Sequence, residues 1–353
     1  MMTPTPQQTI ASEVETRASR QITRANDIVI PTPIPFKPGQ ARTEFGIQIH
    51  GCGPNHKQSI RQAKDLGFTW IKQQVRWGDM SARPGQMDWS CLDTVIPTVH
   101  ERGLKVLLSL TTAPTYLRVS HDKLGFPNEL SPFAYYVYEL LTRYRGQVHA
   151  IEVWNEPNID AEVSDGINYA RYTIMLSLGY AVAKTIDPHI MVISAGLAPV
   201  DFDSFYTAVD DVSFLKGIAE RGAYGYMDCI GAHANGPPGR GDLQPLATQY
   251  HALSGYTKPI CVTEFGYALP VRGQLPCGFG WAKTHTTQSQ AKHLIDGMAW
   301  ARASGITRLV IVWNLDVYST FDARDCNAPY ALSRADWQSP ALPALKSYLR
   351  QPK

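Results

Sequence analysis

The chain lacks several features that would each assign it to a class of proteins. No stretch of its 353 residues reaches the roughly 18 uninterrupted apolar residues of a membrane span, so none is predicted. The first 25 residues lack the apolar run of a secretory signal. Lys plus Arg number 33 and Asp plus Glu 31, which gives a formal net charge of +2. This balance does not indicate a nucleic-acid or anionic-membrane partner.

Motifs for metal, redox and serine chemistry are missing as well. The six cysteines form no Cys-x-x-Cys pair, and the ten histidines include no His-x-x-x-His pair with a partner carboxylate. No Gly-x-Ser-x-Gly nucleophile elbow occurs. We therefore expect no metal ion and no cofactor. No Asn-x-Ser/Thr acceptor occurs, so nothing suggests N-glycosylation.

The cysteines fall into different surroundings. Cys229 and Cys261 lie in apolar runs and are interpreted as buried small hydrophobes. Cys277 and Cys326 lie in polar segments that contain Pro and Gly, and they are candidates for a disulfide, with free surface thiols as the alternative.

What is present points to one large folded unit. Hydrophobic residues make up 44% and charged residues 18%, so a sizeable core is available and wholesale disorder is excluded. Residues 1–40 are polar and Pro-rich, which predicts a flexible tail or linker. Residues 41–353 are expected to form a single domain, since no internal repeat or second domain is visible.

Apolar runs alternate regularly with helical patterns in that domain. Continuous Val/Ile/Leu runs are typical of parallel strands buried on both faces, and eight candidates occur: Phe45–His50, Thr69–Val75, Lys105–Leu110, Ala150–Asn155, Ile190–Ala195, Met227–Ala232, Ile260–Glu264 and Leu309–Trp313. The expected helices are His56–Leu66, Leu92–Arg102, Pro132–Arg145, Asn168–Ile186, Asp203–Arg221 and Gln288–Ser304. This alternation predicts an α/β fold, a single (β/α)₈ TIM barrel. A doubly wound open sheet is the alternative, but Gly51-Cys52-Gly53-Pro54 lacks the third glycine of a phosphate-binding turn.

Two predicted strands end in a carboxylate. The fourth runs Ala150-Ile151-Glu152-Val153-Trp154 into Asn155-Glu156-Pro157, and the seventh runs Ile260-Cys261-Val262-Thr263 into Glu264-Phe265-Gly266. A single Glu at a strand end can simply be partly hydrated, or it can form a salt bridge. Two of them, on strands four and seven of a barrel, would project into the same central mouth, where barrel enzymes carry their chemistry.

Asn-Glu-Pro after an aliphatic strand, with a later strand ending in Glu, resembles the clan A retaining glycoside hydrolases. The segment from Leu66-Gly67-Phe68 to Lys72, with Trp77, Pro84-Gly85 and Asp88-Trp89, is similar to the second strand and loop of the family 39-like and family 5-like barrel glycosidases. Glu101-Arg102-Gly103-Leu104-Lys105 resembles the start of their third strand. The resemblance covers residues 44–315.

The resemblance implies roles for three residues. Glu156 matches the general acid/base and Glu264 the nucleophile of the retaining enzymes. Their mechanism needs two carboxyl groups about 5–5.5 Å apart, one protonated and one ionised. Like charges at that distance are expected to keep a proton on the acid. Asn155 matches the residue that binds the sugar 2-hydroxyl, although it could instead cap the turn before Pro157.

Further substrate-binding candidates come from the strand ends. His233 ends the sixth strand, where the clan often has a His or Tyr near the nucleophile; a loop histidine bonded to backbone is the alternative. Trp313 ends the eighth strand, where an indole can stack under a sugar ring, or can simply pack in the barrel. His50 ends the first strand. Four more aromatic residues are candidates for the walls of the cleft, namely Trp77, Tyr116, Tyr267 and Trp281, whereas Trp154 is expected to pack in the barrel.

One position departs from the family pattern. Where an Arg commonly supports the nucleophile, the matching residue is Lys72, which supplies a point charge without a planar fork. Three alternatives remain open: Lys72 takes this role, Arg76 reaches in instead, or the support is lost.

The expected function is retaining hydrolysis of β-glycosidic bonds in an oligo- or polysaccharide, with a carbohydrate as the substrate and no nucleic-acid partner; the sequence does not indicate an oligomeric state. A sugar-binding barrel of weak activity and a transglycosylase are the alternatives. The long loops after the seventh and eighth strands hold Cys277 and Cys326, so a disulfide would tie these loops together beside the mouth. This disulfide and the Pro-rich lead favour an exported protein shown without its signal or anchor; a cytoplasmic enzyme is the alternative.

Overall fold

The computed structural model describes residues 33, 36, 37, 39 and 42–351, apart from 121–123, 164, 201–206, 240, 276, 317–324 and 335–336. The predicted tail, residues 1–40, thus lies almost entirely outside the described residues. So does the start of the helix expected from Asp203. No helix among the described residues is long and apolar enough to cross a membrane.

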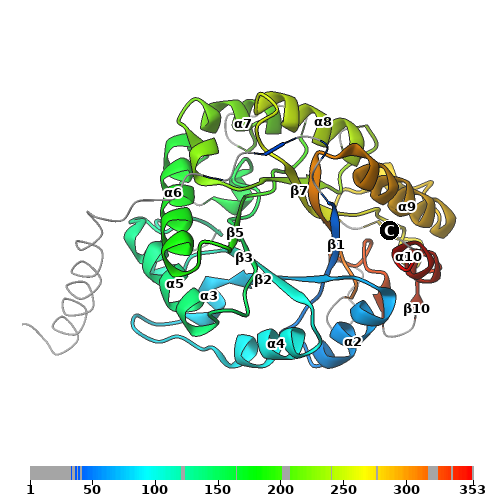
Figure 1. Ribbon diagram of the computed structural model, residues 1–353, viewed down its shortest axis with the longest axis horizontal. Coiled ribbons are helices and arrows are strands. Elements are labelled where there is room, and N and C mark those ends of the chain that lie inside the picture. Colours follow the sequence, from blue (N-terminus) through cyan, green and yellow to red (C-terminus); the bar gives the residue numbers. More distant parts are fainter. Residues whose placement is uncertain are drawn as a thin grey trace, which may run out of the picture.

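Eight strands form one parallel sheet in the order β5-β4-β3-β2-β1-β8-β7-β6. A single bridge between Ile193 and Cys229 joins the two end strands, so the sheet is nearly closed. Viewed along its axis, the strands form an inner ring (Figure 1). They are β1 (Glu44–Gln48), β2 (Trp70–Arg76), β3 (Lys105–Thr111), β4 (Ala150–Val153), β5 (Met191–Ser194), β6 (Ile230–Ala234), β7 (Ile260–Phe265) and β8 (Thr307–Val312).

Helices surround this ring and connect its strands (Figure 1). Gly67 and Gly305 end two of them in the left-handed conformation that glycine adopts without strain, at φ of 101° and 66°. The helices are α2 (His56–Leu66), α3 (Trp77–Met80), α4 (Ser90–Glu101), α5 (Ser131–Arg143), α6 (Tyr169–Ile186), α7 (Asp211–Ala219), α8 (Leu243–Leu253), α9 (Thr287–Ser304) and α10 (Ala341–Leu349).

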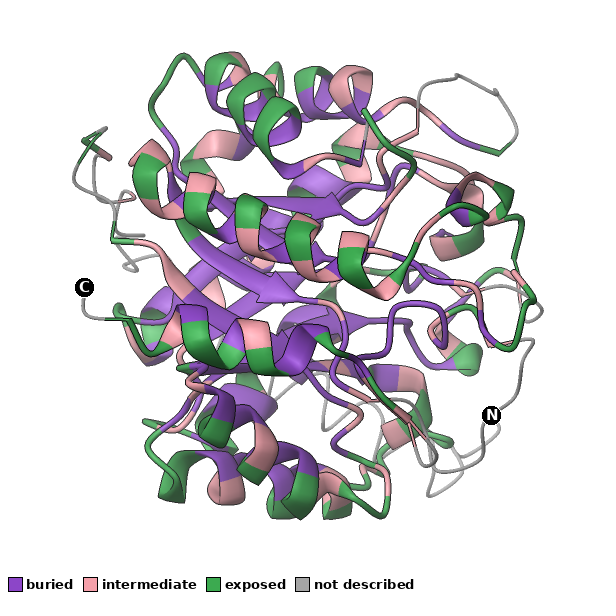
Figure 2. Cartoon of the chain, turned by 90° about the vertical axis from the view of Figure 1, so that its right-hand side faces the viewer, coloured by how far each residue is buried: buried purple, intermediate pink, exposed green. Residues whose placement is uncertain are grey.

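The buried residues form two separate layers around the strands. A large apolar cluster lies between strands and helices, and the strands are the most uniformly buried part of the chain (Figure 2). A small cluster fills the barrel interior, and it includes Trp70, Leu107, Met191 and Ile311. Gly46 makes room there, because a Cβ at this position would lie 2.6 Å from the Cβ of Trp70. Alternate residues of each strand therefore face inward, as in other TIM barrels.

The predicted (β/α)₈ barrel is confirmed, with strand ends shifted by a few residues. Helices α3, α8 and α10 are additional to the predicted ones. A two-stranded ribbon of β9 (Ser333–Arg334) and β10 (Trp337–Gln338) follows the barrel.

The cysteines form three disulfides, more than expected. Cys277 is bonded to Cys326, the pair that the sequence singled out. Cys229 and Cys261 are buried, but they are not the unpaired hydrophobes that their apolar surroundings predicted: a disulfide joins Cys229, just before β6, to Cys261 of the neighbouring strand β7. The third disulfide joins Cys52, after β1, to Cys91 in α4. The described residues contain no free cysteine.

We expect mild reduction of the folded protein to open these disulfides in order of their exposure. Cys277, Cys326 and Cys52 are exposed, whereas Cys229 and Cys261 are fully buried in the barrel, where a reductant cannot reach without unfolding. Alkylation after graded dithiothreitol, followed by peptide mass spectrometry, should label Cys277 and Cys326 well before Cys229 and Cys261. Simultaneous labelling of all three pairs would contradict this order.

Candidate active site

A cavity of about 510 Å³ opens at the carboxyl ends of the strands, which is enough room for a small ligand. Glu156 and Glu264 both line it, so the two strand-end carboxylates face one space as the sequence predicted. Polar residues dominate the rest of the lining, among them Gln48, His50, Gln73, Gln74, Arg76, Asp79, Asp88, Ser90, Asn155, Glu162, Asn235 and Asn327.

Glu156 is held at the mouth by the loop that follows β4. Its backbone N–H donates to Gly196 O at 3.0 Å, and its φ of 40° lies in the left-handed region that a non-glycine residue rarely adopts. Asn158 fixes the next part of the loop: its Nδ2 donates to the carbonyl oxygens of Ala198 and Val209, and its Oδ1 accepts from the Ala198 N–H. The Asn-Glu-Pro-Asn run is thus locked to the chain that follows β5.

Glu264, in β7, receives a hydrogen bond on each carboxylate oxygen. Lys72 Nζ donates to Oε1 at 3.2 Å, and Asn235 Nδ2 donates to Oε2 at 2.9 Å. Asn235 is itself fixed, since Tyr330 Oη donates to its backbone oxygen at 2.5 Å. These bonds hold the carboxylate in one orientation. Of the three alternatives for the second-strand support, the structure shows Lys72 bonded to Glu264, while Arg76 pairs with Asp79 at 3.6 Å.

His233, in β6, bridges the two carboxylates. Its Nδ1 lies 2.8 Å from Glu156 Oε1 and 3.7 Å from Glu264 Oε2, and the ring is fully buried. Its Nε2 faces Glu152 Oε1 at 3.7 Å. Burial alone would lower the pKa of His233, but Glu264, Glu152 and Glu156 raise it to about 10. A proton therefore resides next to Glu156 at neutral pH.

Gly196 is required by this histidine. A Cβ at residue 196 would lie 2.1 Å from Cδ2 and 2.2 Å from Nε2 of His233, closer than atoms can approach. The buried ring cannot move aside without breaking its bond to Glu156.

We expect Gly196→Ala to lower the free energy of unfolding by about 1–3 kcal/mol, as overpacked cores do, and to impair activity as well. Gly225→Ala is the matched control, because nothing lies within 4 Å of a Cβ there. Urea unfolding of the two variants tests the contrast. Equal stability of both would show that the His233 ring is free to shift.

A buried ion-pair network lies beneath the carboxylates. Lys72 Nζ lies 3.0 Å from Glu152 Oε2, and both side chains are fully buried in the barrel. Burial alone would raise the pKa of Glu152 and lower that of Lys72. Lys72 and His233 nevertheless hold the pKa of Glu152 well below its usual range, and Glu152 and Glu264 raise that of Lys72. Both groups are thus charged at neutral pH, and Glu152 is the counter-ion that keeps Lys72 and His233 in place.

The spacing of the carboxylates bears on their chemistry. One oxygen each of Glu156 and Glu264, with a ring nitrogen of His233, all lie within 4.8 Å of one another. Three such ligand atoms could also hold a metal ion. The cationic Lys72 ammonium 3.2 Å from Glu264 and the proton on His233 oppose a cation at this point.

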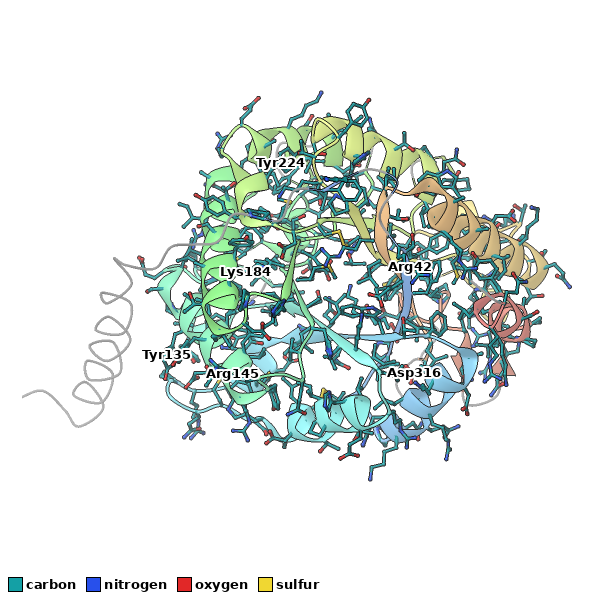
Figure 3. The ribbon with its side chains drawn as sticks, in the orientation of Figure 1. Arg42, Tyr135, Arg145, Lys184, Tyr224 and Asp316 are labelled. Carbon is teal, nitrogen blue, oxygen red and sulfur yellow. A yellow bond between two sulfur atoms is a disulfide. The ribbon has the colours of Figure 1, made fainter. Side chains whose placement is uncertain are left out.

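Three other predicted residues lie where the sequence placed them, at the cavity. Trp313 lines it, half-buried, with its ring against Tyr330 at 4.4 Å. Asn155 also lines it. His50 reaches it from the end of β1, where its backbone N–H donates to Asp316 Oδ1 at 3.0 Å. The Asp316 carboxylate also accepts a hydrogen bond from the Ser59 hydroxyl of α2. Asp316 is labelled in Figure 3.

Four aromatic residues were predicted to form walls of the cleft, but none of them is among the described residues that line the cavity. Trp77 is buried in the helical layer, stacked on Tyr136 at 4.9 Å, because β2 ends one residue earlier and α3 turns it outward. Tyr267 stacks on His285 at 4.0 Å, and the ring of Trp281 lies 5.5 Å from the same histidine ring. Tyr116 is exposed, with its hydroxyl 2.8 Å from Ser81 Oγ. Trp154 packs, as expected, against Phe126 and Phe133.

Sequence reasoning gave no role to Glu152, Asn235 or Glu162. The role of Glu152 could have been predicted, because a Glu inside an aliphatic strand needs a buried partner, and Lys72 lies two strands away. Asn235 lies two residues after His233 and thus shares its side of the strand end. Glu162 lies in a short turn, Asp160–Glu162, and nothing in the sequence distinguishes it from a surface residue.

Comparison with known proteins agrees with the fold. No family model matches the chain, and no curated protein matches it in sequence. Solved structures of glycoside hydrolases share the fold. A family 39 glycoside hydrolase from Bacteroides cellulosilyticus WH2 is 16% identical with a TM-score of 0.63, over 88% of this chain and 64% of that one. A GH5_18 protein from Streptomyces cattleya, solved with GlcNAc, is 14% identical with a TM-score of 0.66, over 88% and 80%. The exo-β-1,4-mannosidase Op5Man5 from Opitutaceae bacterium strain TAV5 is 15% identical with a TM-score of 0.60, over 92% and 62%. These likenesses show that the chain shares the barrel fold of these proteins.

Proposed function

We propose that the protein is a retaining glycoside hydrolase that cleaves β-glycosidic bonds of an oligo- or polysaccharide. The observation that carries this proposal is the approach of Glu156 and Glu264 at the mouth of the barrel, where one carboxylate oxygen of each lies within 4.8 Å of the other. Retaining enzymes separate their carboxyl groups by about 5–5.5 Å, whereas inverting enzymes need about 6.5–9.5 Å to admit a water molecule.

The roles follow from the contacts of each carboxyl group. Glu264, held by Lys72 and Asn235, attacks the anomeric carbon and forms a covalent bond to it, while Glu156 gives its proton to the leaving oxygen. In the second step Glu156 takes a proton from water, the hydroxide attacks the anomeric carbon, and Glu264 leaves as a carboxylate. His233, 2.8 Å from Glu156, shares the transferred proton between these steps.

The remaining candidates support binding. Trp313 offers a flat apolar face to the sugar ring, and Asn155 lies beside Glu156 to bind the 2-hydroxyl. The intact Lys72–Glu264 ion pair argues against a degenerate barrel that only binds sugar. A transglycosylase would use the same residues, and adding a sugar acceptor to the assay separates the two activities.

We also propose that the protein is exported. Three disulfides are typical of proteins that mature in an oxidising compartment.

The test is hydrolysis of a panel of p-nitrophenyl β-glycosides and β-glycans, with the first product followed by proton NMR. A retaining mechanism predicts that the β-anomer of the sugar appears first and then mutarotates. An α-anomer appearing first, or no cleavage of any panel member, would refute the proposal.

A further inference from the structure

A third carboxyl group lines the cavity next to the two that carry the proposed chemistry. Glu162 belongs to the turn after β4, six residues beyond Glu156, and it lines the cavity together with Asn155. Its backbone is fixed on both sides: Trp154 Nε1 donates to its carbonyl oxygen at 3.0 Å, and its own N–H donates to Ile159 O at 3.2 Å. The Asn155 side chain forms a hydrogen bond with its carboxyl group.

We propose that Glu162 is a substrate-binding residue whose protonated carboxyl group donates a hydrogen bond to a hydroxyl of an uncharged glycan. This inference rests on the proposed function and extends it to the class of substrate. Asn155 also lines the cavity, and its side-chain oxygen has no hydrogen-bond partner among the described residues. Glu162 as donor and Asn155 as acceptor, side by side, suit a pair of neighbouring sugar hydroxyls.

The charges around Glu162 explain why it keeps a proton. The charged groups that face it are Glu156, Glu264 and Arg76. Arg76 is already paired with Asp79, and its side chain is 45% exposed, so it neutralises little of the negative charge. Burial, with the charges of Glu156 and Glu264, raises the pKa of Glu162 to about 8.

The substrate class follows from the same charges. A glycan carrying carboxylate or sulfate groups would enter a space whose lining also includes the carboxyl groups of Asp79, Asp88 and Glu264, and the repulsion would weaken its binding. Below pH 8 Glu162 is a neutral donor. Above pH 8 it is ionised and cannot donate, and it adds a further negative charge, so binding and turnover fall together.

The experiment uses the 2,4-dinitrophenyl β-glycoside of whichever sugar the wild type hydrolyses fastest. Dinitrophenolate leaves without protonation, so kcat/KM for this substrate does not report the proton on Glu156. We expect kcat/KM of the wild type to fall above about pH 8, and Glu162→Gln to lack this fall because the amide still donates but cannot ionise. Glu162→Ala should lose about 10- to 100-fold in kcat/KM at pH 7, mainly through KM.

Asp160→Asn, in the same turn but outside the cavity lining, is the matched control and should behave as the wild type. Thermal melts check that each variant is folded, and the Glu162→Gln profile remains informative if Glu162→Ala fails to fold. An unchanged alkaline fall in Glu162→Gln, or wild-type kcat/KM in Glu162→Ala, would overturn the role of Glu162 while leaving the glycosidase intact. A wild-type chain that cleaves no panel member would overturn the proposed function itself.

Discussion

Glu264→Gln is expected to lower kcat by about five to six orders of magnitude, the scale of loss when an enzyme loses its nucleophile. The amide keeps the shape of the side chain and can still face Lys72 and Asn235, which bind the two carboxylate oxygens. It cannot form the covalent bond, however, because a neutral amide is a very weak nucleophile. Steady-state assays on the best substrate of the panel measure the loss.

The surface variant Glu101→Gln is the control for that experiment, since residue 101 is exposed at the end of α4. Its kcat should equal that of the wild type. Residual activity of Glu264→Gln within about tenfold of the wild type would assign the nucleophile to another residue, or the activity to a contaminant.

Glu156→Ala is expected to depend on the leaving group. For a glycan or an unactivated aryl glycoside, kcat/KM should fall by about 10²- to 10⁴-fold, which is the contribution of a general acid. For a 2,4-dinitrophenyl glycoside the loss of kcat/KM should be small, because that leaving group needs no proton. Removing the side chain also frees space beside His233, which lies 2.8 Å from it.

Azide provides the control for this variant. With Glu264 intact, azide can enter the space left by Glu156 and attack the covalent intermediate, restoring turnover and giving a β-glycosyl azide. Equal losses on activated and unactivated substrates, with no rescue by azide, would contradict the assignment of Glu156 as acid/base.

The sequence predicts the barrel well because its strands are buried on both faces. A mostly apolar run such as Ile190–Ala195 predicts such a strand from its own residues alone, without knowledge of distant contacts. The carboxylates were predictable for a related reason: Glu156 and Glu264 each end such a run, and barrel closure brings those ends together.

The errors arise where position depends on contacts between distant segments. Trp77 looks like a residue of the cleft in sequence, but α3 begins at this residue and turns its ring onto Tyr136 of α5. Cys229 and Cys261 look like unpaired hydrophobes, yet parallel pairing of β6 and β7 places their Cα atoms 5.8 Å apart. Glu162 becomes a pocket residue only through the fold of its turn.

The measurement that tests the central claim most directly is trapping of the glycosyl-enzyme. A 2-deoxy-2-fluoro glycosyl fluoride of the sugar that the protein hydrolyses should form the covalent intermediate and slow its breakdown. Mass spectrometry of the intact chain should then show the addition of one fluorosugar, and peptide sequencing should place it on Glu264. A sugar attached to any other residue, or full inactivation without a covalent adduct, would contradict double displacement through Glu264.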